Sequence, residues 1–251
     1  MPAPFPQASV VIPVHNREQL VVDAISSVRQ TTVDVEIIVV DDGSDDHTAR
    51  IVGDMALRDP SVRLLRQPRS GPAAARNAGV ASARGEFLSF ADSDDLCAPG
   101  KLERQICKLE DHPELVAVVG AVAGFKSLDG QGNPLCDPEH PRRHNAALQA
   151  ATFRTERFRG YGELAREMRF AEDVDYFLRL LEADAPLLLE PEIACMYRFH
   201  EHNMTRRLDE RNQGYVRAYA RSLARRRQAG RSGPLRSFFN QVIQRDMIIG
   251  G

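Results

Sequence analysis

The chain has 251 residues, of which 43% are hydrophobic and 27% charged, and its formal net charge is −2. These values are ordinary for a soluble globular protein, and the absence of any run near about 18 apolar residues argues against a membrane-spanning helix. Four cysteines lie far apart without a CxxC pair, which argues against a disulfide framework or a zinc site. The first residues lack the basic start and apolar run of a signal peptide, so we expect a cytoplasmic protein.

Short apolar runs alternate with amphipathic stretches from the start of the chain. The runs predict strands at 9–14, 35–40, 62–65, 86–90 and 115–120. Helical spacing of apolar residues predicts helices at about 18–30, 46–58, 71–83 and 100–110. Because successive parallel strands need right-handed crossovers, this order predicts an α/β fold with a doubly wound, mostly parallel sheet.

The second half of the sequence is less regular. A turn signal at 129–133 predicts a β-hairpin over 125–135, and residues 137–169 suggest a loop region with a short helix. A further helix is expected at about 171–183, followed by strands at 186–189 and 193–199. The tail at 209–246 predicts one or two helices, broken at 230–234.

The tail is strongly basic. From residue 201 onward the chain contains eleven arginines against four acidic residues, which favours an anionic partner. Nucleic acid is not expected, because the tail lacks interleaved aromatic residues and any recognised nucleic-acid motif. A solvated helix face, contact with an anionic membrane surface and packing in a homodimer remain open readings of this tail.

Two of the predicted strands end in clusters of acidic residues. Strand 86–90 is followed by Asp92, Ser93, Asp94 and Asp95, and strand 35–40 by the acidic turn 41–46. Asp-rich turns are common for purely local reasons, because Asp hydrogen-bonds its own backbone. Two such turns at the carboxyl ends of parallel strands nevertheless predict one shared crevice. Crowded carboxylates favour Mg²⁺ or Mn²⁺, which usually bring a phosphate, so the clusters indicate nucleotide chemistry.

Three further places carry candidate site residues. Asp173 lies in the first turn of the helix at 171–183, where the helix dipole favours a carboxylate and where a general base could be held rigidly. Arg76 lies in a helix of small residues that begins near the same strand ends, where it could meet a phosphate or instead be solvated. His200 shares a predicted strand face with Arg198 and could lie beside a metal or a diphosphate.

Taken together, the chain resembles the family 2 glycosyltransferases of the GT-A fold over about Ser9 to Thr205. Each segment alone is weak evidence for the family, but the six segments in this order and with this spacing are specific for it. The resemblance is carried by Ser9-Val-Val-Ile-Pro-Val-His-Asn16, Val40-Asp-Asp-Gly-Ser44, Gly71-Pro-Ala-Ala-Ala-Arg-Asn-Ala-Gly79, Phe90-Ala-Asp-Ser-Asp-Asp95, Glu172-Asp173 and Tyr197-Arg-Phe-His200.

This resemblance implies roles for individual residues. Pro13, Val14 and Asn16 would line the nucleoside pocket, Asp42 would bind the base, and Arg76 would lie near the base or the diphosphate. The triplet Asp92-Ser93-Asp94 looks like the family's DxD motif, with Asp92 near the ribose or the metal and Asp94 on the metal. His200 would help to hold the Mn²⁺ or Mg²⁺, and Asp173 looks like the catalytic base.

The resemblance also implies a domain plan and a reaction. Residues 1–205 would form the GT-A domain, with a nucleotide-sugar-binding half at 8–120, an acceptor-binding half at 121–205, and a basic helical tail at 206–251. The expected reaction is metal-dependent transfer of a sugar, with inversion, from a nucleotide-diphospho-sugar, with a lean to UDP, to an acceptor hydroxyl. That acceptor would be a glycan or a lipid-linked molecule in polysaccharide, glycolipid or other glycoconjugate synthesis.

Rival functions remain, together with an open question of location. A sugar nucleotidyltransferase would share the fold and the metal but normally needs a glycine-rich loop after the first strand, where this chain has Pro13 to Arg17. A catalytically inactive nucleotide-sugar-binding protein would have no need of a base at Asp173. The basic tail adds peripheral contact with the inner face of the membrane, or a homodimer, to the expected partners.

Overall fold

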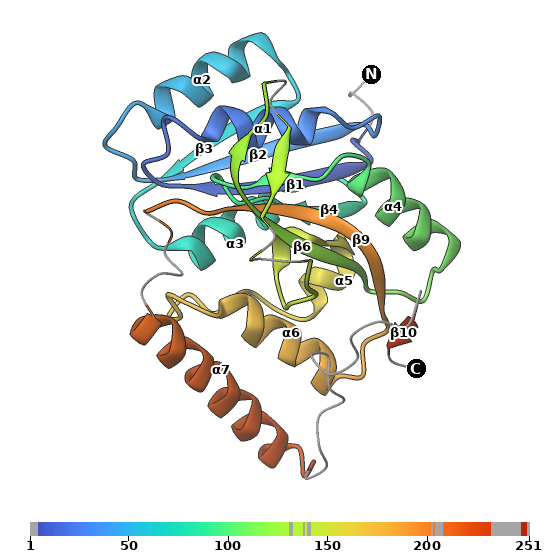
Figure 1. Ribbon diagram of the computed structural model, residues 1–251. Coiled ribbons are helices and arrows are strands. Elements are labelled where there is room, and N and C mark those ends of the chain that lie inside the picture. Colours follow the sequence, from blue (N-terminus) through green and yellow to red (C-terminus); the bar gives the residue numbers. More distant parts are fainter. Residues whose placement is uncertain are drawn as a thin grey trace.

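The computed structural model describes residues 5–130, 133–137, 139, 142–201, 203, 208–231 and 247–249. Its centre is one mixed sheet with strand order β10-β9-β6-β8-β4-β1-β2-β3, flanked by helices (Figure 1). The strands are β1 (Ala8–Val14), β2 (Val35–Asp42), β3 (Val62–Gln67), β4 (Phe87–Phe90), β5 (Leu96–Cys97), β6 (Ala117–Leu128), β7 (Pro134–Cys136), β8 (Ala151–Arg154), β9 (Leu187–Arg198) and β10 (Met247–Ile249). The helices are α1 (Val21–Arg29), α2 (Thr48–Arg58), α3 (Pro72–Ser82), α4 (Lys101–Asp111), α5 (Thr155–Gly160), α6 (Glu172–Glu182) and α7 (Leu208–Gln228), with a short 3₁₀ turn at Leu148–Ala150.

The first half of the chain forms the predicted parallel layer. Strand β1 lies between β2 and β4, and β3 pairs with β2, all in parallel register. Alternate residues of β1 bury on opposite faces, Val10 and Ile12 against α1, α2 and α4, and Val11 against α3. Helices therefore cover both faces of the sheet, as a doubly wound α/β fold requires, and this prediction is confirmed.

Beyond β4, the order of the strands in the sheet differs from the order predicted from the sequence. Strand β8 lies between β4 and β6 and is antiparallel to both, so the strand predicted at 115–120 does not pair with its predecessor. Four residues are too few to show a period of two, which explains why the sequence did not reveal β8. Because β8 is antiparallel to both of its neighbours, β6 points in the same direction as β4. Strand β9 runs parallel to β6.

The remaining strand predictions hold with altered bounds. The expected hairpin is present as the antiparallel pair β6 and β7. The two strands expected at 186–189 and 193–199 are one strand, β9, whose pairing with β6 shifts register around Ala121. The carboxyl ends of β1, β2, β4 and β9 consequently lie along one edge of the sheet, on the left of Figure 1.

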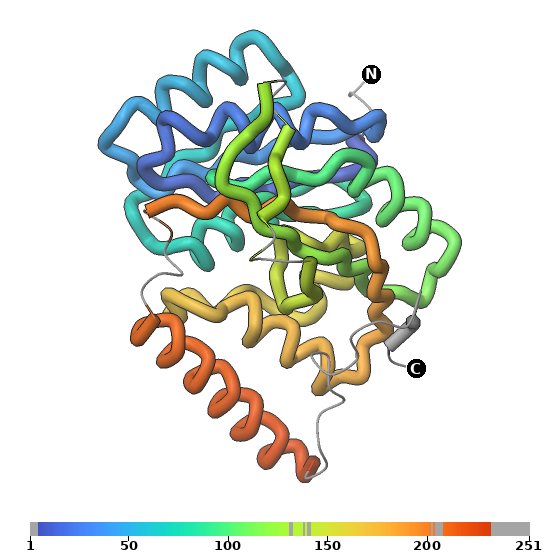
Figure 2. The backbone as a smooth tube through the Cα atoms, viewed as in Figure 1, coloured from blue at the N-terminus to red at the C-terminus, as the bar shows by residue number. Residues whose placement is uncertain are grey.

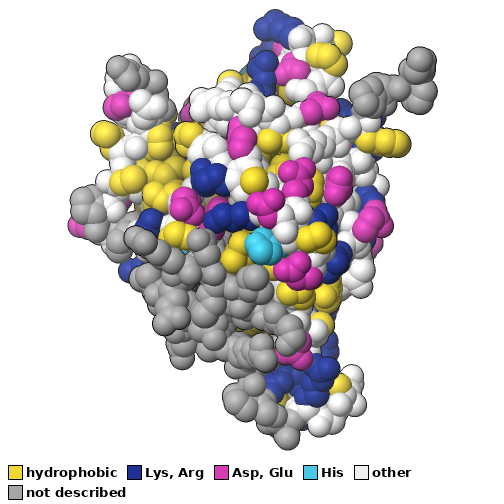
Figure 3. Space-filling view, turned by 90° about the vertical axis from the view of Figure 1, so that its right-hand side faces the viewer, with side chains coloured by type: hydrophobic (Ala, Val, Ile, Leu, Met, Phe, Trp, Pro, Cys, Tyr) yellow, Lys and Arg dark blue, Asp and Glu magenta, His cyan; other side chains and the backbone are white. Residues whose placement is uncertain are grey.

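The tail begins with α7, which packs along α6 (Figure 2). Ala218 and Ser222 of α7 are buried, and Arg225 donates hydrogen bonds to Asp175 and Glu182 of α6. Arg221 also pairs with Asp175, so these two tail arginines neutralise acidic residues of this same chain. Basic side chains gather at the lower end of the molecule, at the height of the C-terminal end of α7 (Figure 3).

The tail's remaining predictions fall mostly beyond these residues. The predicted break at 230–234 and the helix beyond it lie largely outside the described residues, apart from the short strand β10. No helix in the described part of the chain has the length and apolar character needed to cross a membrane. Membrane contact, dimerisation and the domain boundary at residue 205 stay predictions.

Candidate functional site

The acidic segment after β4 meets the ends of β1 and β9 at the sheet edge. Asp94 Oδ2 accepts a hydrogen bond from Arg17 Nε at 3.2 Å and lies 3.1 Å from His200 Nε2. Arg17 follows β1, and His200 follows β9, so three distant segments converge on one carboxylate. The expected proximity of Asp94 and His200 is thus present in the structure.

The electrostatics of Asp94 follow from these contacts. Burial raises the pKa of Asp94, but the hydrogen bond with His200 and the charge of Arg17 outweigh it and lower that pKa below its usual value. The carboxylate is therefore anionic at neutral pH and 18% exposed. One carboxylate beside one imidazole suits a Mg²⁺ or Mn²⁺ ion that takes most of its ligands from phosphate and water. No group of three or more His, Cys, Asp or Glu side chains that could hold a metal ion occurs in the described part of the chain.

Asp95 has a structural place in the same segment. Its side chain is buried, and Oδ1 accepts a hydrogen bond from the backbone N–H of Arg198 at 2.9 Å. Burial, together with the charges of Asp94 and Asp92, raises the pKa of Asp95 well above its usual value. The Arg198 side chain donates to the Asp94 backbone carbonyl and pairs with Asp23. These bonds fix the end of β9 against the acidic segment and so orient His200.

Asp92 faces a different partner, Arg76 of α3. Arg76 Nη2 lies 2.6 Å from Asp92 Oδ1, and Nη1 lies 2.5 Å from Glu172 Oε1 at the start of α6. The Arg76 side chain is only 10% exposed, and that of Glu172 only 8%. A planar guanidinium can bind two carboxylates at once, and because its donors are pre-organised it loses little side-chain entropy for each hydrogen bond. Arg76 therefore joins the segment after β4 to the first turn of α6.

Asn77, the next residue of α3, anchors the loop that leads into α6. Its side-chain amide donates to the Leu164 carbonyl and accepts from the Leu164 N–H, both at 2.9 Å. Below this loop, Tyr176 of α6 stacks on Phe158 at a centroid distance of 4.3 Å and donates to the Phe158 carbonyl. The helix thus starts at a defined position, after Ala171 in the left-handed conformation with φ of 61°.

Asp173 occupies the first turn of this helix beside the arginine bridge. Its Oδ1 accepts a hydrogen bond from the Val174 N–H at 2.7 Å, and the side chain is partly exposed. Burial, followed by repulsion from Glu172, raises the pKa of Asp173 to about 7, although Arg76 acts in the opposite direction. A carboxylate with such a pKa can accept a proton near neutral pH.

The residues expected in the nucleoside pocket are held mainly by local bonds. Asp42 is buried, and it accepts hydrogen bonds from Gln67 Nε2 and from the backbone N–H groups of Ser70 and Gly71, each at 2.8 Å. Asp42 thus fixes the loop that enters α3, where Gly71 has φ of 92°.

The segment after β1 contains the other expected pocket residues. Val14 is 2% exposed and packs in the core, whereas Pro13 is partly exposed at the end of β1. The Asn16 side chain binds the acidic turn after β2, with Nδ2 at 2.5 Å from Asp45 Oδ1. Ser93, between the two aspartates after β4, is buried.

Three residues of this site were not singled out from the sequence: Arg17, Arg198 and Glu172 as the partner of Arg76. Each lies beside a predicted site residue in the sequence. Arg17 follows Asn16, Arg198 lies two residues before His200, and Glu172 precedes Asp173. For Arg17 and Arg198 a signal existed, because a positive charge beside a strand end that faces an acidic cluster favours an ion pair. What sequence cannot give is the choice of partner.

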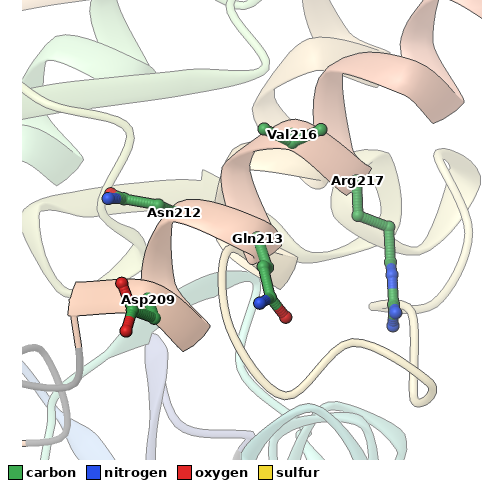
Figure 4. Close-up of a pocket in the computed structure, with 5 residues that line it drawn as sticks. All are labelled: Asp209, Asn212, Gln213, Val216 and Arg217. Carbon is green, nitrogen blue, oxygen red and sulfur yellow. The ribbon is translucent and has the colours of Figure 1, made fainter.

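A separate hollow of about 670 Å³ lies on α7. Its lining contains none of the predicted site residues. Figure 4 shows the side chains around it, all from this one helix: Asp209, Asn212, Gln213, Val216 and Arg217. We therefore assign the site to the strand ends and not to this hollow.

Comparison with known proteins identifies the family of the chain. The family model described as glycosyl transferase family 2 matches residues 9–167. A protein of Haemophilus influenzae named an uncharacterized glycosyltransferase is 34% identical over 185 residues, covering 71% of this chain and 73% of that protein. The succinoglycan biosynthesis protein ExoO of Rhizobium meliloti is 32% identical over 245 residues, covering 86% of this chain and 69% of ExoO.

Solved structures share the fold at lower identity. TarS 1-349 of S. aureus in complex with UDP-GlcNAc has a TM-score of 0.65 and 20% identity, covering 80% of this chain and 61% of that one. GalNAc-T7 with UDP, GalNAc and Mn²⁺ has a TM-score of 0.66 and 16% identity, covering 87% of this chain and 48% of that one. The chain therefore spans about half of these solved chains. On the match to the family model and to the H. influenzae relative, the chain belongs to glycosyl transferase family 2.

Proposed function

We propose that this glycosyltransferase moves a sugar, with inversion, from a nucleotide-diphospho-sugar, most simply a UDP-sugar, to an acceptor hydroxyl of a growing glycan or glycoconjugate. The observation that carries the proposal is the Arg76 bridge between Asp92 and Glu172. It brings the acidic segment after β4 and the first turn of α6 into one site. A donor-binding group and a proton acceptor are thereby available side by side, as a direct displacement requires.

Two kinds of relatives support the choice of donor and pathway class. TarS and GalNAc-T7 are solved with UDP-GlcNAc and with UDP, respectively, and ExoO is named for succinoglycan biosynthesis. We carry the uridine nucleotide and the polysaccharide context over to this chain as part of the proposal.

A divalent cation fits the donor side of the site. Asp94 and His200 would hold it, and Mg²⁺ or Mn²⁺ bound there would offset the negative charge of the leaving diphosphate. Arg17, which now pairs with Asp94, supplies a further positive charge at the same place. Asp92 would face the ribose or the metal from its position on Arg76.

The acceptor side depends on Asp173. Its carboxylate would accept the proton of the acceptor hydroxyl while that oxygen attacks the anomeric carbon from the face opposite the leaving group. A single displacement inverts the configuration and needs no second carboxylate as nucleophile, unlike a retaining glycosidase. A pKa of about 7 suits a base that must be ionised before the reaction and protonated during it.

Calorimetric titration tests the donor proposal. Purified protein would be titrated with UDP, GDP, dTDP and CMP, each with Mn²⁺, with Mg²⁺ and with a chelator. We expect metal-dependent binding of UDP and much weaker binding of the others. Equal binding of all four, or binding unaffected by the chelator, would contradict the proposed donor and metal.

Asp173→Asn tests the reaction. The variant should bind UDP as the parent does, while transfer to any active acceptor falls by about 10²- to 10⁴-fold, the usual contribution of a general base. Asp54→Asn, a surface change in the half-exposed Arg50–Asp54 pair of α2, serves as the matched control and should keep full activity. Undiminished transfer by Asp173→Asn would remove Asp173 as the base. Formation of a sugar nucleotide from a sugar phosphate and UTP would support the nucleotidyltransferase instead.

A further inference from the structure

The N-terminal half of α7 lies against the segment that leads into α6. A Cβ atom at Gly214 would lie 2.8 Å from both Cβ and the carbonyl oxygen of Phe170, three residues before Asp173. Arg169 and Glu210 form an ion pair at 3.8 Å across the same junction. Figure 1 shows the two helices beginning near one another and running side by side. The tail helix is therefore a neighbour of the proposed catalytic base.

Two tyrosines of α7 lie on the side of the helix next to this junction. Tyr215 follows Gly214, and Tyr219 lies one turn further on, so the two rings share a helix face. Tyr215 is 39% exposed and Tyr219 47% exposed. Burial raises the pKa of the Tyr215 phenol, and the Asp173 carboxylate raises it further. Because Gly214 packs against Phe170, the next residue, Tyr215, lies near the first turn of α6, which contains Asp173.

Arg211 completes the same column one turn before Tyr215. The positive charge of Arg211 lowers the pKa of the Tyr215 phenol, whereas the Asp173 carboxylate raises it. The column therefore combines one cationic group with two exposed rings that each carry a hydroxyl group. Such a combination offers flat apolar faces and hydrogen-bonding groups together, next to the atom that would take the acceptor's proton.

We propose that Tyr215 and Tyr219 form an acceptor subsite, in which a sugar ring of a glycan acceptor stacks on Tyr215 and presents its hydroxyl to Asp173. This rests on the proposed function, because it assumes that Asp173 is the base. The apolar face of a pyranose ring matches an aromatic ring, and its hydroxyl groups match the phenol groups and the Arg211 guanidinium. The subsite lies in the predicted tail, outside the stretch 121–205 expected to bind the acceptor.

The observations favour a sugar over a lipid chain at this position. Both large side chains of the column are tyrosines, whose hydroxyl groups would have to be desolvated against an acyl chain at a cost in free energy. Val216, which is 69% exposed, lies outside the column, whereas Leu223, which is 46% exposed, follows Tyr219 by one turn. Val216 instead lines the separate hollow on α7 (Figure 4).

Saturation-transfer NMR with simple sugars tests the subsite. The probes are the methyl glycosides of glucose, galactose, rhamnose and N-acetylglucosamine, measured with full-length protein, with and without UDP and Mg²⁺. The variants are Tyr215→Ala, Tyr215→Phe and Tyr219→Ala, and Val216→Ala is the matched control from the same helix. Nucleotide affinity is measured on the same samples by calorimetry, which also reports whether each variant is folded.

We expect at least one glycoside to bind, Tyr215→Ala to weaken it about tenfold or more, and Tyr215→Phe to retain most of the affinity because the ring remains. Tyr219→Ala should have a smaller effect, Val216→Ala none, and UDP binding should not change. Equal glycoside binding by the parent and Tyr215→Ala, or none to a parent that binds UDP, would overturn the subsite. Tyr215-dependent binding of dodecyl phosphate in place of glycosides would overturn it in favour of a lipid. Failure of UDP to bind the parent would instead contradict the proposed function.

Discussion

Arg76 and Glu172 are 96 positions apart in the sequence, yet Nη1 of Arg76 lies 2.5 Å from Oε1 of Glu172. The same guanidinium binds Asp92 through its other terminal nitrogen, so one cation serves two carboxylates inside a poorly exposed site. Burial and the negative charge of Asp92 raise the pKa of Glu172, while Arg76 opposes this increase. The start of α6, and with it Asp173, therefore depends electrostatically on a residue of α3.

Removal of Arg76 should destabilise the protein and abolish transfer. Arg76→Met leaves two largely buried carboxylates without a counter-ion, and breaking such a pair typically costs about 3–5 kcal/mol of unfolding free energy. The double variant Arg76→Met/Glu172→Gln removes one of the stranded charges and should recover part of this loss. Urea unfolding of the parent, both single variants and the double variant measures the coupling. Additive effects would mean that the bridge contributes nothing as a unit.

The raised pKa of Asp173 predicts a pH-dependent stability. Between its ordinary pKa of 3.8 and about 7, the folded protein holds a proton that the unfolded chain has released, so stability falls as the pH rises through this range. Asp173→Asn removes the cost of ionisation. It should therefore raise the unfolding free energy by about 1–3 kcal/mol at pH about 8 and change it little at pH about 4.

The same group predicts the pH profile of catalysis. If Asp173 must be ionised to act, the transfer rate should rise with pH and level off above an apparent pKa near 7. Initial rates with saturating donor and acceptor, buffered between pH about 5 and 9, would show this limb. A rate that is flat across this range would be inconsistent with Asp173 as the base.

Asp94 and Asp95 are adjacent but should respond differently to the same substitution. Asp94→Asn removes the charge that faces Arg17 and His200, and we expect the metal-dependent part of UDP affinity to fall by about tenfold or more. Asp95→Asn keeps an oxygen able to accept the hydrogen bond from the Arg198 N–H, so it serves as the matched control. Calorimetry with Mn²⁺ and with a chelator compares the two variants. Equal losses of metal dependence would argue against a special role for Asp94.

Two glycines test the packing of the fold without touching the site. A Cβ atom at Gly85 would lie 2.5 Å from the Ser9 backbone nitrogen and from the Ala8 carbonyl carbon, which cannot move without disturbing β1. Gly85→Ala should therefore lower the unfolding free energy by about 2 kcal/mol or more. Gly53 lies inside α2, where a Cβ atom would make only an ordinary contact with Leu64 at 3.9 Å. Gly53→Ala should instead stabilise by up to about 1 kcal/mol.

The elements of the first half were predictable because each has a clear apolar period. Val21, Ala24, Ile25 and Val28 are spaced as one helix face, and all four are buried in α1. Strand β8 was not predictable, because four residues are too few to establish a period and its neighbours in the sheet are far away in sequence. Local patterns thus identify elements but not the order in which a sheet assembles them.

The candidate site was predictable to a similar degree. Asp94 and His200 were expected on one site, and the structure brings them to 3.1 Å. The guanidinium of Arg76 was expected near a nucleotide, and its visible partners are Asp92 and Glu172. An arginine near several acids can pair with any of them, and the choice is set by tertiary packing, which a single sequence does not report.

The placement of β8 also bears on how the chain acquires its structure during synthesis. Strand β4 carries the acidic segment at its end, and its second edge is covered only when residues 152–154 pair with it. A nascent chain that ends near residue 120 therefore exposes an unpaired hydrogen-bonding edge next to Phe87 and Leu88, which invites association with other chains. The proposed nucleotide half at 8–120 should accordingly aggregate when expressed alone. We expect its folding and that of the following segment to form one cooperative event.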